Sequence, residues 1–173
     1  MGTGDVSLTM DDRRTVVRFA VDCAQRILPT FEAVAPQDPR PRDALAAARA
    51  FADGADRSNL LRTAAFASHR ASKDVTTEAA RLAALACGDA AAAAYLHAIA
   101  KATQVGHILR AAACAARVAE LTTGDVGDAV HALAERAAPP LPEILGRYPV
   151  APRGSTRVSE LMCLLDSAIR DRR

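Results

Sequence analysis

Runs of alanine interspersed with leucine, valine and isoleucine constrain the fold of this chain more than any other feature. Alanine supplies 41 of the 173 residues, whereas aromatic residues make up 3%. Alanine has the highest intrinsic helix propensity. Strands favour β-branched and aromatic residues in alternation with polar ones, and no segment of useful length shows that alternation. The sequence therefore predicts an all-α protein, a compact bundle of about six to eight Ala-rich helices that approach one another closely.

The length and charge of the chain narrow its class further. A chain of 173 residues is expected to form a single helical domain over residues 1–173, with residues 1–8 as a disordered N-terminus. Lysine and arginine number 22 against 20 aspartates and glutamates, a net charge of +2, which argues against a general nucleic-acid-binding protein. The N-terminus lacks the pattern of a secretory signal, and no apolar run is long enough to cross a bilayer. We therefore expect a cytoplasmic protein with no membrane association.

Start and stop signals divide the chain into helices. Thr9 followed by Asp12 predicts a capping box that opens the first helix. One line along that helix carries apolar side chains at helical spacing, namely Val16, Ala20, Ala24, Ile27 and Phe31. The Gly88-Asp89 pair predicts a turn or a weak point in the helix. The expected helices cover residues 10–33, 41–53, 57–73, 75–87, 90–121, 126–137 and 156–170, with a short helical turn near 143–147.

The segment from Ala90 to Ala116 predicts a buried helix because it is apolar around nearly its whole circumference. Its few polar side chains would share an arc of about 120°. They are His97, Lys101, Gln104 and His107. A buried lysine must reach water, pair with a carboxylate or lose its charge.

Two interpretations of this polar group stay open. In the first, His97 and Gln104 form hydrogen bonds with the neighbouring backbone while Lys101 reaches solvent. In the second, the side chains line a pocket or an exposed groove and have perturbed titration. Four acidic residues are candidates to pair with the lysine, and the sequence does not choose among them. They are Asp22, Asp43, Asp53 and Glu78.

Other charged residues are candidates for contact with a partner. Asp22 and Arg26 stand four residues apart on the predicted outer side of the first helix. Arg40 and Arg42 open the second helix after a proline-rich connector, where a rigid backbone would present them. Such pairs are typical of solvated helix ends, and they also suit the binding of an acidic protein surface.

The sequence holds no signature of a cofactor or a metal site. Its four cysteines are far apart and lie among apolar residues, which favours small buried side chains. His69, His97 and His107 lack the close ligand pairs of a zinc site, so we expect no metal. No nucleotide-binding, hydrolase or zinc-protease motif is present, and we expect no cofactor. Whether the chain is an enzyme stays open.

Four segments are similar to segments of one bacterial family. They are residues 19–29, residues 38–42 with 46–51, residues 93–97 with 100–107, and the last helix around residues 159–162. Together they resemble the immunity-protein-five-like family of bacterial polymorphic toxin systems, over about residues 9 to 170. This resemblance implies an all-helical cytoplasmic protein that binds and neutralises a cognate toxin, and it implies no catalytic residues. Immunity proteins commonly meet basic toxins with an acidic surface, so a chain of net charge +2 would bind through a local patch.

Three hypotheses of function follow. The first is a protein that binds a cognate toxin or another protein partner. The second is a small-molecule-binding or small catalytic protein of specialised metabolism, with its site inside the bundle around His97, Lys101 and Gln104. The third is a homo-oligomer that associates through its Ala-rich faces.

Overall fold

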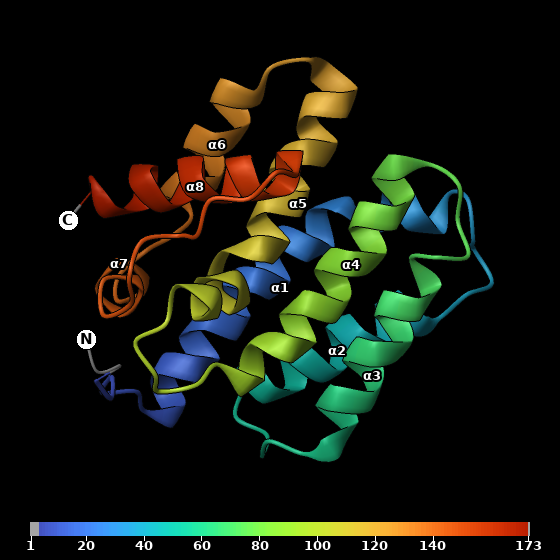
Figure 1. The fold of residues 1–173 in the computed structure, drawn as a ribbon. Coiled ribbons are helices and arrows are strands. Elements are labelled where there is room, and N and C mark those ends of the chain that lie inside the picture. The colour runs from blue at the N-terminus through green and yellow to red at the C-terminus, as the bar shows by residue number, and fades with distance from the viewer. Residues whose placement is uncertain (1–3, 173) are drawn as a thin grey trace.

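Helices account for all the regular structure of residues 4–172, the part of the chain that the computed structural model describes (Figure 1). An isolated bridge between Asp5 and Ile99 is the only β-type pairing among these residues. The all-α prediction is therefore confirmed. In chain order the α-helices are α1 (Met10–Glu32), α2 (Arg40–Ala52), α3 (Asn59–Ala71), α4 (Glu78–Ala92), α5 (Val105–Thr123), α6 (Val126–Glu135), α7 (Leu141–Leu145) and α8 (Arg157–Arg170), with short 3-10 helices at η1 (Ala93–Tyr95) and η2 (Ala102–Gln104).

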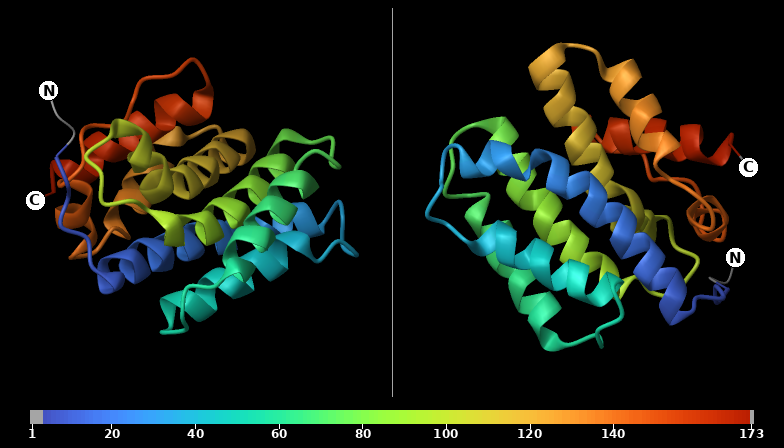
Figure 2. Two further views of the ribbon diagram at one scale, coloured as in Figure 1. Left: turned by 60° about the horizontal axis from the view of Figure 1, so that its bottom comes forward. Right: turned by 180° about the vertical axis from the view of Figure 1, so that it is seen from behind.

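Helix α1 is the longest helix of residues 4–172 and lies on the face seen from behind in Figure 2. It begins as predicted, because the Thr9 hydroxyl accepts a hydrogen bond from the backbone N–H of Asp12 and the Asp12 carboxylate accepts one from that of Thr9. The apolar line predicted along this helix is buried throughout. Helices α2, α4 and α5 all pack against α1, so its buried side forms part of the core.

The helices form two groups, and α5 contacts both. Helices α1 to α4 pack against one another as a four-helix bundle, and α5 lies beside α1 and α4. Helices α6 and α8 cover the opposite side of α5 (Figures 1 and 2). Helix α5 thus joins the N-terminal bundle to the C-terminal helices.

The predicted turn at Gly88-Asp89 is wrong. Helix α4 continues through both residues to Ala92, and both are buried. Glycine costs a helix only about 1 kcal/mol relative to alanine, so tertiary packing can override its preference. Here α4 passes so close to α3 that a side chain at position 88 would collide with His69.

The predicted continuous helix over residues 90–121 is also wrong. The chain leaves the helical conformation at Leu96 and enters α5 at Val105. Helices α4 and α5 lie side by side and run in opposite directions, so the chain has to reverse between them (Figure 1).

Tertiary hydrogen bonds replace the helical ones in this reversal. The Val6 N–H donates to the Ala98 carbonyl at 3.0 Å, and the Ala100 N–H donates to the Gly4 carbonyl at 3.2 Å. Residues 4–8 belong to the segment expected to be disordered, and Val6 is buried among them. Residues 1–3 lie outside the described part of the chain. Among the helices described, none has the length and apolar composition needed to span a membrane.

Candidate functional site

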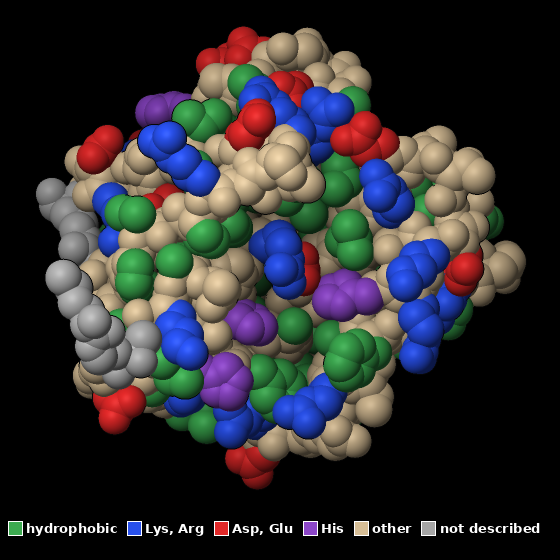
Figure 3. Space-filling view, viewed as in Figure 1, with side chains coloured by type: hydrophobic (Ala, Val, Ile, Leu, Met, Phe, Trp, Pro, Cys, Tyr) green, Lys and Arg blue, Asp and Glu red, His purple; other side chains and the backbone are tan. Residues whose placement is uncertain are grey.

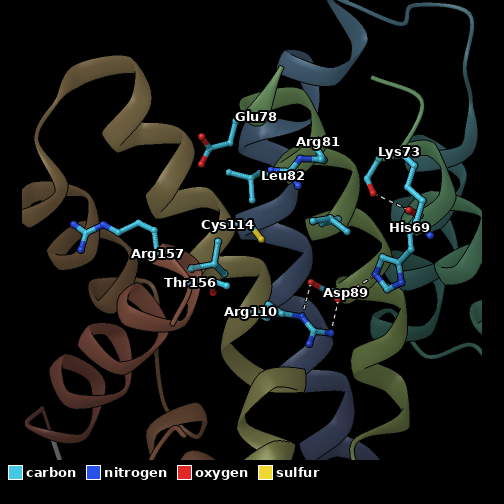
Figure 4. A pocket seen from close by; sticks show the side chains of 13 residues that line it. His69, Lys73, Glu78, Arg81, Leu82, Asp89, Arg110, Cys114, Thr156 and Arg157 are labelled. Carbon is cyan, nitrogen blue, oxygen red and sulfur yellow. Dashed lines mark hydrogen bonds and ion pairs between the residues drawn. The ribbon is translucent and has the colours of Figure 1, made fainter. Parts of the chain in front are cut away.

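A pocket of about 590 Å³ opens between α3, α4, α5 and the start of α8 (Figure 4). In that view His69 and Lys73 lie on one side, Thr156 and Arg157 on the other, and Asp89 with Arg110 between them. Basic and histidine side chains gather over the middle of the same face in the space-filling view (Figure 3). The pocket therefore combines several charged groups in one concave surface.

A buried carboxylate lies at the centre of the pocket. The Asp89 side chain is 5% exposed and comes from α4. Arg110 of α5 donates from Nε to Oδ2 at 2.9 Å and from Nη2 to Oδ1 at 2.7 Å. Burial raises the pKa of Asp89, but hydrogen bonds from His69 and Arg110 outweigh burial, so the pKa lies below its ordinary value. Asp89 is therefore ionised at neutral pH.

His69 of α3 completes a three-residue cluster. Its Nε2 lies 3.1 Å from Oδ1 of Asp89. An ionised carboxylate only accepts hydrogen bonds, so Nε2 carries the proton. Within the described residues the other ring nitrogen, Nδ1, makes no hydrogen bond. His69 therefore uses one ring nitrogen to hold the Asp89 carboxylate.

Gly88 allows the cluster to form. A Cβ atom at this position would lie 2.4 Å from Cδ2 of His69 and 2.9 Å from the Ala65 carbonyl oxygen. Only glycine lets α3 and α4 approach so closely at this level. The glycine thus permits the imidazole to lie against α4, beside Asp89.

The Cys114 thiol in the pocket is not activated as a nucleophile. Cys114 of α5 is buried, and burial raises the pKa of its thiol. A reactive cysteine requires a thiolate, which forms beside cations or helix N-termini. Cys23 and Cys87 are buried as predicted, and Cys163 is half-buried. The described residues include no group of three His, Cys, Asp or Glu side chains placed to hold a metal ion.

The structure separates the polar side chains that the sequence placed on one buried helix. His97 and Lys101 are exposed in the connection between α4 and α5. In the described part of the chain the Lys101 amine makes no hydrogen bond or ion pair. Gln104 binds the backbone instead, since its Oε1 accepts from the His97 N–H at 2.9 Å. The expected interior site around these three residues is therefore wrong, because the chain reverses at the surface there.

His107 is the member of that group that the fold brings near the pocket. It lies in the first turn of α5, half-buried, and its buried Nδ1 has no hydrogen-bond partner among the described residues. Burial lowers its pKa, and the nearby Arg110 guanidinium lowers it further. His107 is therefore a neutral ring that packs beside the Asp89 cluster.

The other charged candidates form ion pairs within the protein. Asp22 lies 3.8 Å from Arg26 and also pairs with Arg136, which follows α6. Arg40 pairs with Asp38 and Asp74, and Arg42 pairs with Glu32. Asp43 and Asp53, considered as partners of Lys101, make no ion pair with it.

Sequence reasoning missed Asp89, Arg110 and His69 as a cluster. One signal was available, since Asp89 lies among small apolar residues in the segment that became α4, and Arg110 precedes the alanine run of the segment that became α5. A lone charge in an apolar helix requires a partner of opposite sign. Asp89 and Arg110 are 21 residues apart, so spacing within a single helix does not predict that they form a pair.

One comparison with known proteins gives a match. The family model described as Imm-5 like putative immunity protein matches residues 7–143, more than half of the chain. The matched segment contains His69, Asp89 and Arg110, and it ends before α8. Searches of curated proteins and of solved structures found no match.

Proposed function

Because the chain belongs to the Imm-5 like putative immunity protein family, we propose that it binds a protein toxin in the bacterial cytoplasm and thereby neutralises it. The family match over residues 7–143 is the observation that carries this proposal. The chemistry of the pocket agrees with a binding role. Asp89 is fixed by two partners rather than free to exchange a proton, and the Cys114 thiol is protonated.

The toxin-binding surface that we propose lies along α3 beside the pocket, and we call it the α3 face. It consists of Arg57, Arg62, Phe66 and Tyr95. Phe66 is 59% exposed, an unusual environment for a large apolar side chain. The guanidinium groups of Arg57 and Arg62 stack on the Tyr95 ring, with their central carbons 5.3 and 4.8 Å from its centroid. The α3 face therefore presents two aromatic side chains, and the two arginines hold the Tyr95 ring in position.

Helix geometry places Phe66 next to the pocket. Arg62, Phe66 and His69 are separated by four and three residues, so they share one side of α3. Arg62 reaches Tyr95 and His69 reaches Asp89, which shows that this side of α3 borders α4 and η1. Phe66 lies between these two contacts along the helix.

The composition of the α3 face supports a protein partner. Tyrosine and arginine are enriched among the residues that contribute most to the affinity of protein interfaces, and phenylalanine is enriched in interfaces generally. Tyr95 also donates a hydrogen bond from its hydroxyl to the Ser58 carbonyl at 2.9 Å, which fixes the ring before any partner arrives. A preordered ring reduces the entropy lost on binding.

A growth assay tests the proposal. The chain with a photo-crosslinking residue at position 66 would first be used to identify bound proteins in the native host. Each recovered protein would then be expressed in a second bacterium, alone and together with the unmodified chain. We expect one recovered protein to arrest growth and the chain to restore it through a complex that can be isolated.

The assay has clear contrary outcomes. The proposal fails if no protein is crosslinked, if none of the recovered proteins impairs growth, or if the arrest persists when the chain is present. A second crosslinker at position 164, on α8, provides the control. A toxin recovered equally from both positions would contradict the assignment of the α3 face.

A further inference from the structure

The pocket beside the α3 face carries charges that toxin binding does not by itself explain. We propose that this pocket binds a carboxylate group attached to a short apolar chain. The inference concerns the chemistry of the ligand. It applies to an acidic side chain of a protein partner and to a free organic acid, and the experiment below distinguishes these two sources.

The volume of the pocket and its apolar lining suit a ligand with an apolar organic part. Its volume of about 590 Å³ lies within the usual range of small-molecule sites. Leu82, Leu85, Cys114 and Val158 contribute apolar lining from three helices. The protonated Cys114 thiol behaves as a small apolar side chain. An inorganic anion would leave this apolar surface unused.

The charged lining is positive in balance. Lys73, Arg81, Arg110 and Arg157 line the pocket against two acidic side chains, those of Glu78 and Asp89. Both acids are already neutralised. Arg110 binds Asp89 through two hydrogen bonds. Arg117, which lies outside the pocket lining, binds Glu78 at 2.8 Å. A cation would therefore find no free carboxylate in the pocket.

Two of the basic side chains form no close ion pair, although the charge of Arg81 helps to lower the pKa of the nearby Glu78. Within the described residues, the Lys73 ammonium and the Arg81 guanidinium make no hydrogen bond or ion pair. Most other arginines of the pocket region are paired, as Arg157 is with Glu120 and Glu160. Lys73 and Arg81, both exposed at the edge of the pocket, are therefore available to an anion there.

Arg110 adds oriented hydrogen-bond donors to the pocket lining. Its Nε and Nη2 atoms are held by Asp89, and within the described chain its Nη1 group makes no hydrogen bond. The side chain is 47% exposed, so its outer edge is open to a ligand. A guanidinium fixed by a buried carboxylate binds a second carboxylate without first losing side-chain freedom.

NMR titration of the folded chain tests the proposal. The probes are 4-phenylbutyrate as a free acid and a capped peptide of sequence Ala-Leu-Glu-Phe-Ala as a protein-like source. Their controls are 4-phenylbutyramide, which lacks the charge, and inorganic phosphate, which lacks the apolar chain. We expect at least one carboxylate probe to shift the Nε–Hε signals of Arg81 and Arg110, and both controls to shift them much less.

Matched variants locate the binding site. Arg81→Gln and Lys73→Gln each remove one basic side chain at the edge of the pocket, which we call the rim. Each should weaken binding of the carboxylate probe about fivefold to tenfold, because one charge-assisted hydrogen bond is lost. Arg70→Gln removes an exposed arginine of α3 that does not line the pocket, and it should leave binding unchanged. The two rim variants alter exposed side chains, so one of them remains informative if the other fails to fold.

The titrations distinguish a free organic acid from an acidic side chain of a protein partner, and they also test whether the pocket binds a carboxylate at all. Binding of the free acid alone indicates a small-molecule ligand, and tighter binding of the peptide indicates a partner's acidic side chain; either result supports the proposal. The proposal is overturned if neither carboxylate probe binds up to its solubility limit, or if the amide or phosphate binds as tightly. It is also overturned if Arg70→Gln weakens binding as much as Arg81→Gln. The growth assay for toxin neutralisation does not depend on any of these results.

Discussion

The guanidinium of Arg110 binds the carboxylate of Asp89 at two points, with both contacts at 2.9 Å or less. This ion pair joins α4 to α5, the helix that also carries the C-terminal helices. It is buried on the aspartate side and open to the pocket on the arginine side. The same contact thus contributes to the fold and positions a cation in the candidate site.

Replacing Asp89 with asparagine should lower the free energy of unfolding by about 1 to 3 kcal/mol, because Arg110 and His69 lose a charged acceptor. Loss of one partner from a fully buried pair costs about 3 to 5 kcal/mol. We expect less here, since water can solvate the exposed edge of Arg110. Urea unfolding measures the change. Asp128→Asn, at an exposed position of α6, should change stability by no more than about 0.5 kcal/mol, and equal effects would contradict the role of the ion pair.

The contribution of the Asp89 pair should disappear in acid. The pKa of Asp89 is lowered in the folded state, so its contribution is complete above the unfolded value of about 3.9 and is lost as the pH falls through the folded value. The stability difference between the wild-type chain and Asp89→Asn should therefore be constant from pH 7 to pH 5 and shrink below about pH 4. Urea unfolding at several pH values checks this. A difference that persists unchanged at the lowest pH would argue against an ionised Asp89.

Gly88→Ala should destabilise the chain by about 1 to 3 kcal/mol, because the added methyl group would overlap His69 and the Ala65 carbonyl. Elsewhere in a helix this substitution is stabilising by up to about 1 kcal/mol. Gly106→Ala is the matched control, since its Cβ would meet only Nη1 of Arg110, at 3.7 Å. Thermal unfolding should thus give opposite or clearly unequal shifts. Similar shifts for both variants would show that α3 and α4 are not in close contact at Gly88.

His107 should make the chain less stable at mildly acidic pH. Burial lowers its pKa in the folded state, so between that value and the ordinary value of about 6.5 the unfolded chain binds more protons. Stability should therefore fall as the pH is lowered from 7 to 5. Asparagine at this position cannot take up a proton, so His107→Asn should show a smaller fall in the urea midpoint. An identical pH profile for both proteins would exclude His107 as the source.

Phe66→Ser should weaken the complex with the toxin by at least about tenfold, or about 1.4 kcal/mol, if the α3 face carries the interaction. The free chain should keep its stability, because the side chain is 59% exposed. Leu164→Ser on α8 removes another exposed apolar side chain, 48% exposed, and should leave affinity unchanged. Calorimetric titration of the purified proteins measures both. Comparable losses from the two variants would point to a different binding surface.

The first helix shows how much local sequence can predict. Its capping box joins residues three apart, and its apolar line follows the 3.6-residue period, so both are properties of a single helix. The structure has both features at Thr9 and along the buried side of α1. Most other helix boundaries were predicted to within three residues for the same reason.

The segment around Lys101 shows where periodicity fails. Its residues have the composition of a continuous helix, yet the chain reverses there. The reversal is held by groups distant in sequence, including the Tyr148 hydroxyl, which donates to the His97 carbonyl at 2.8 Å. Backbone groups need hydrogen bonds, but those bonds need not come from the same helix. The alternative partners become available only after the chain has folded.

By itself, then, the sequence determined the helical class, most helix limits and the buried side of α1, because these depend on propensity and on contacts between residues three or four apart. Only the tertiary structure decided that Gly88 and Asp89 lie within α4 and that Lys101 lies at the surface. It also decided that His69, Asp89 and Arg110 meet at one pocket. These outcomes depend on which helices become neighbours, and that is set by the packing of the whole chain.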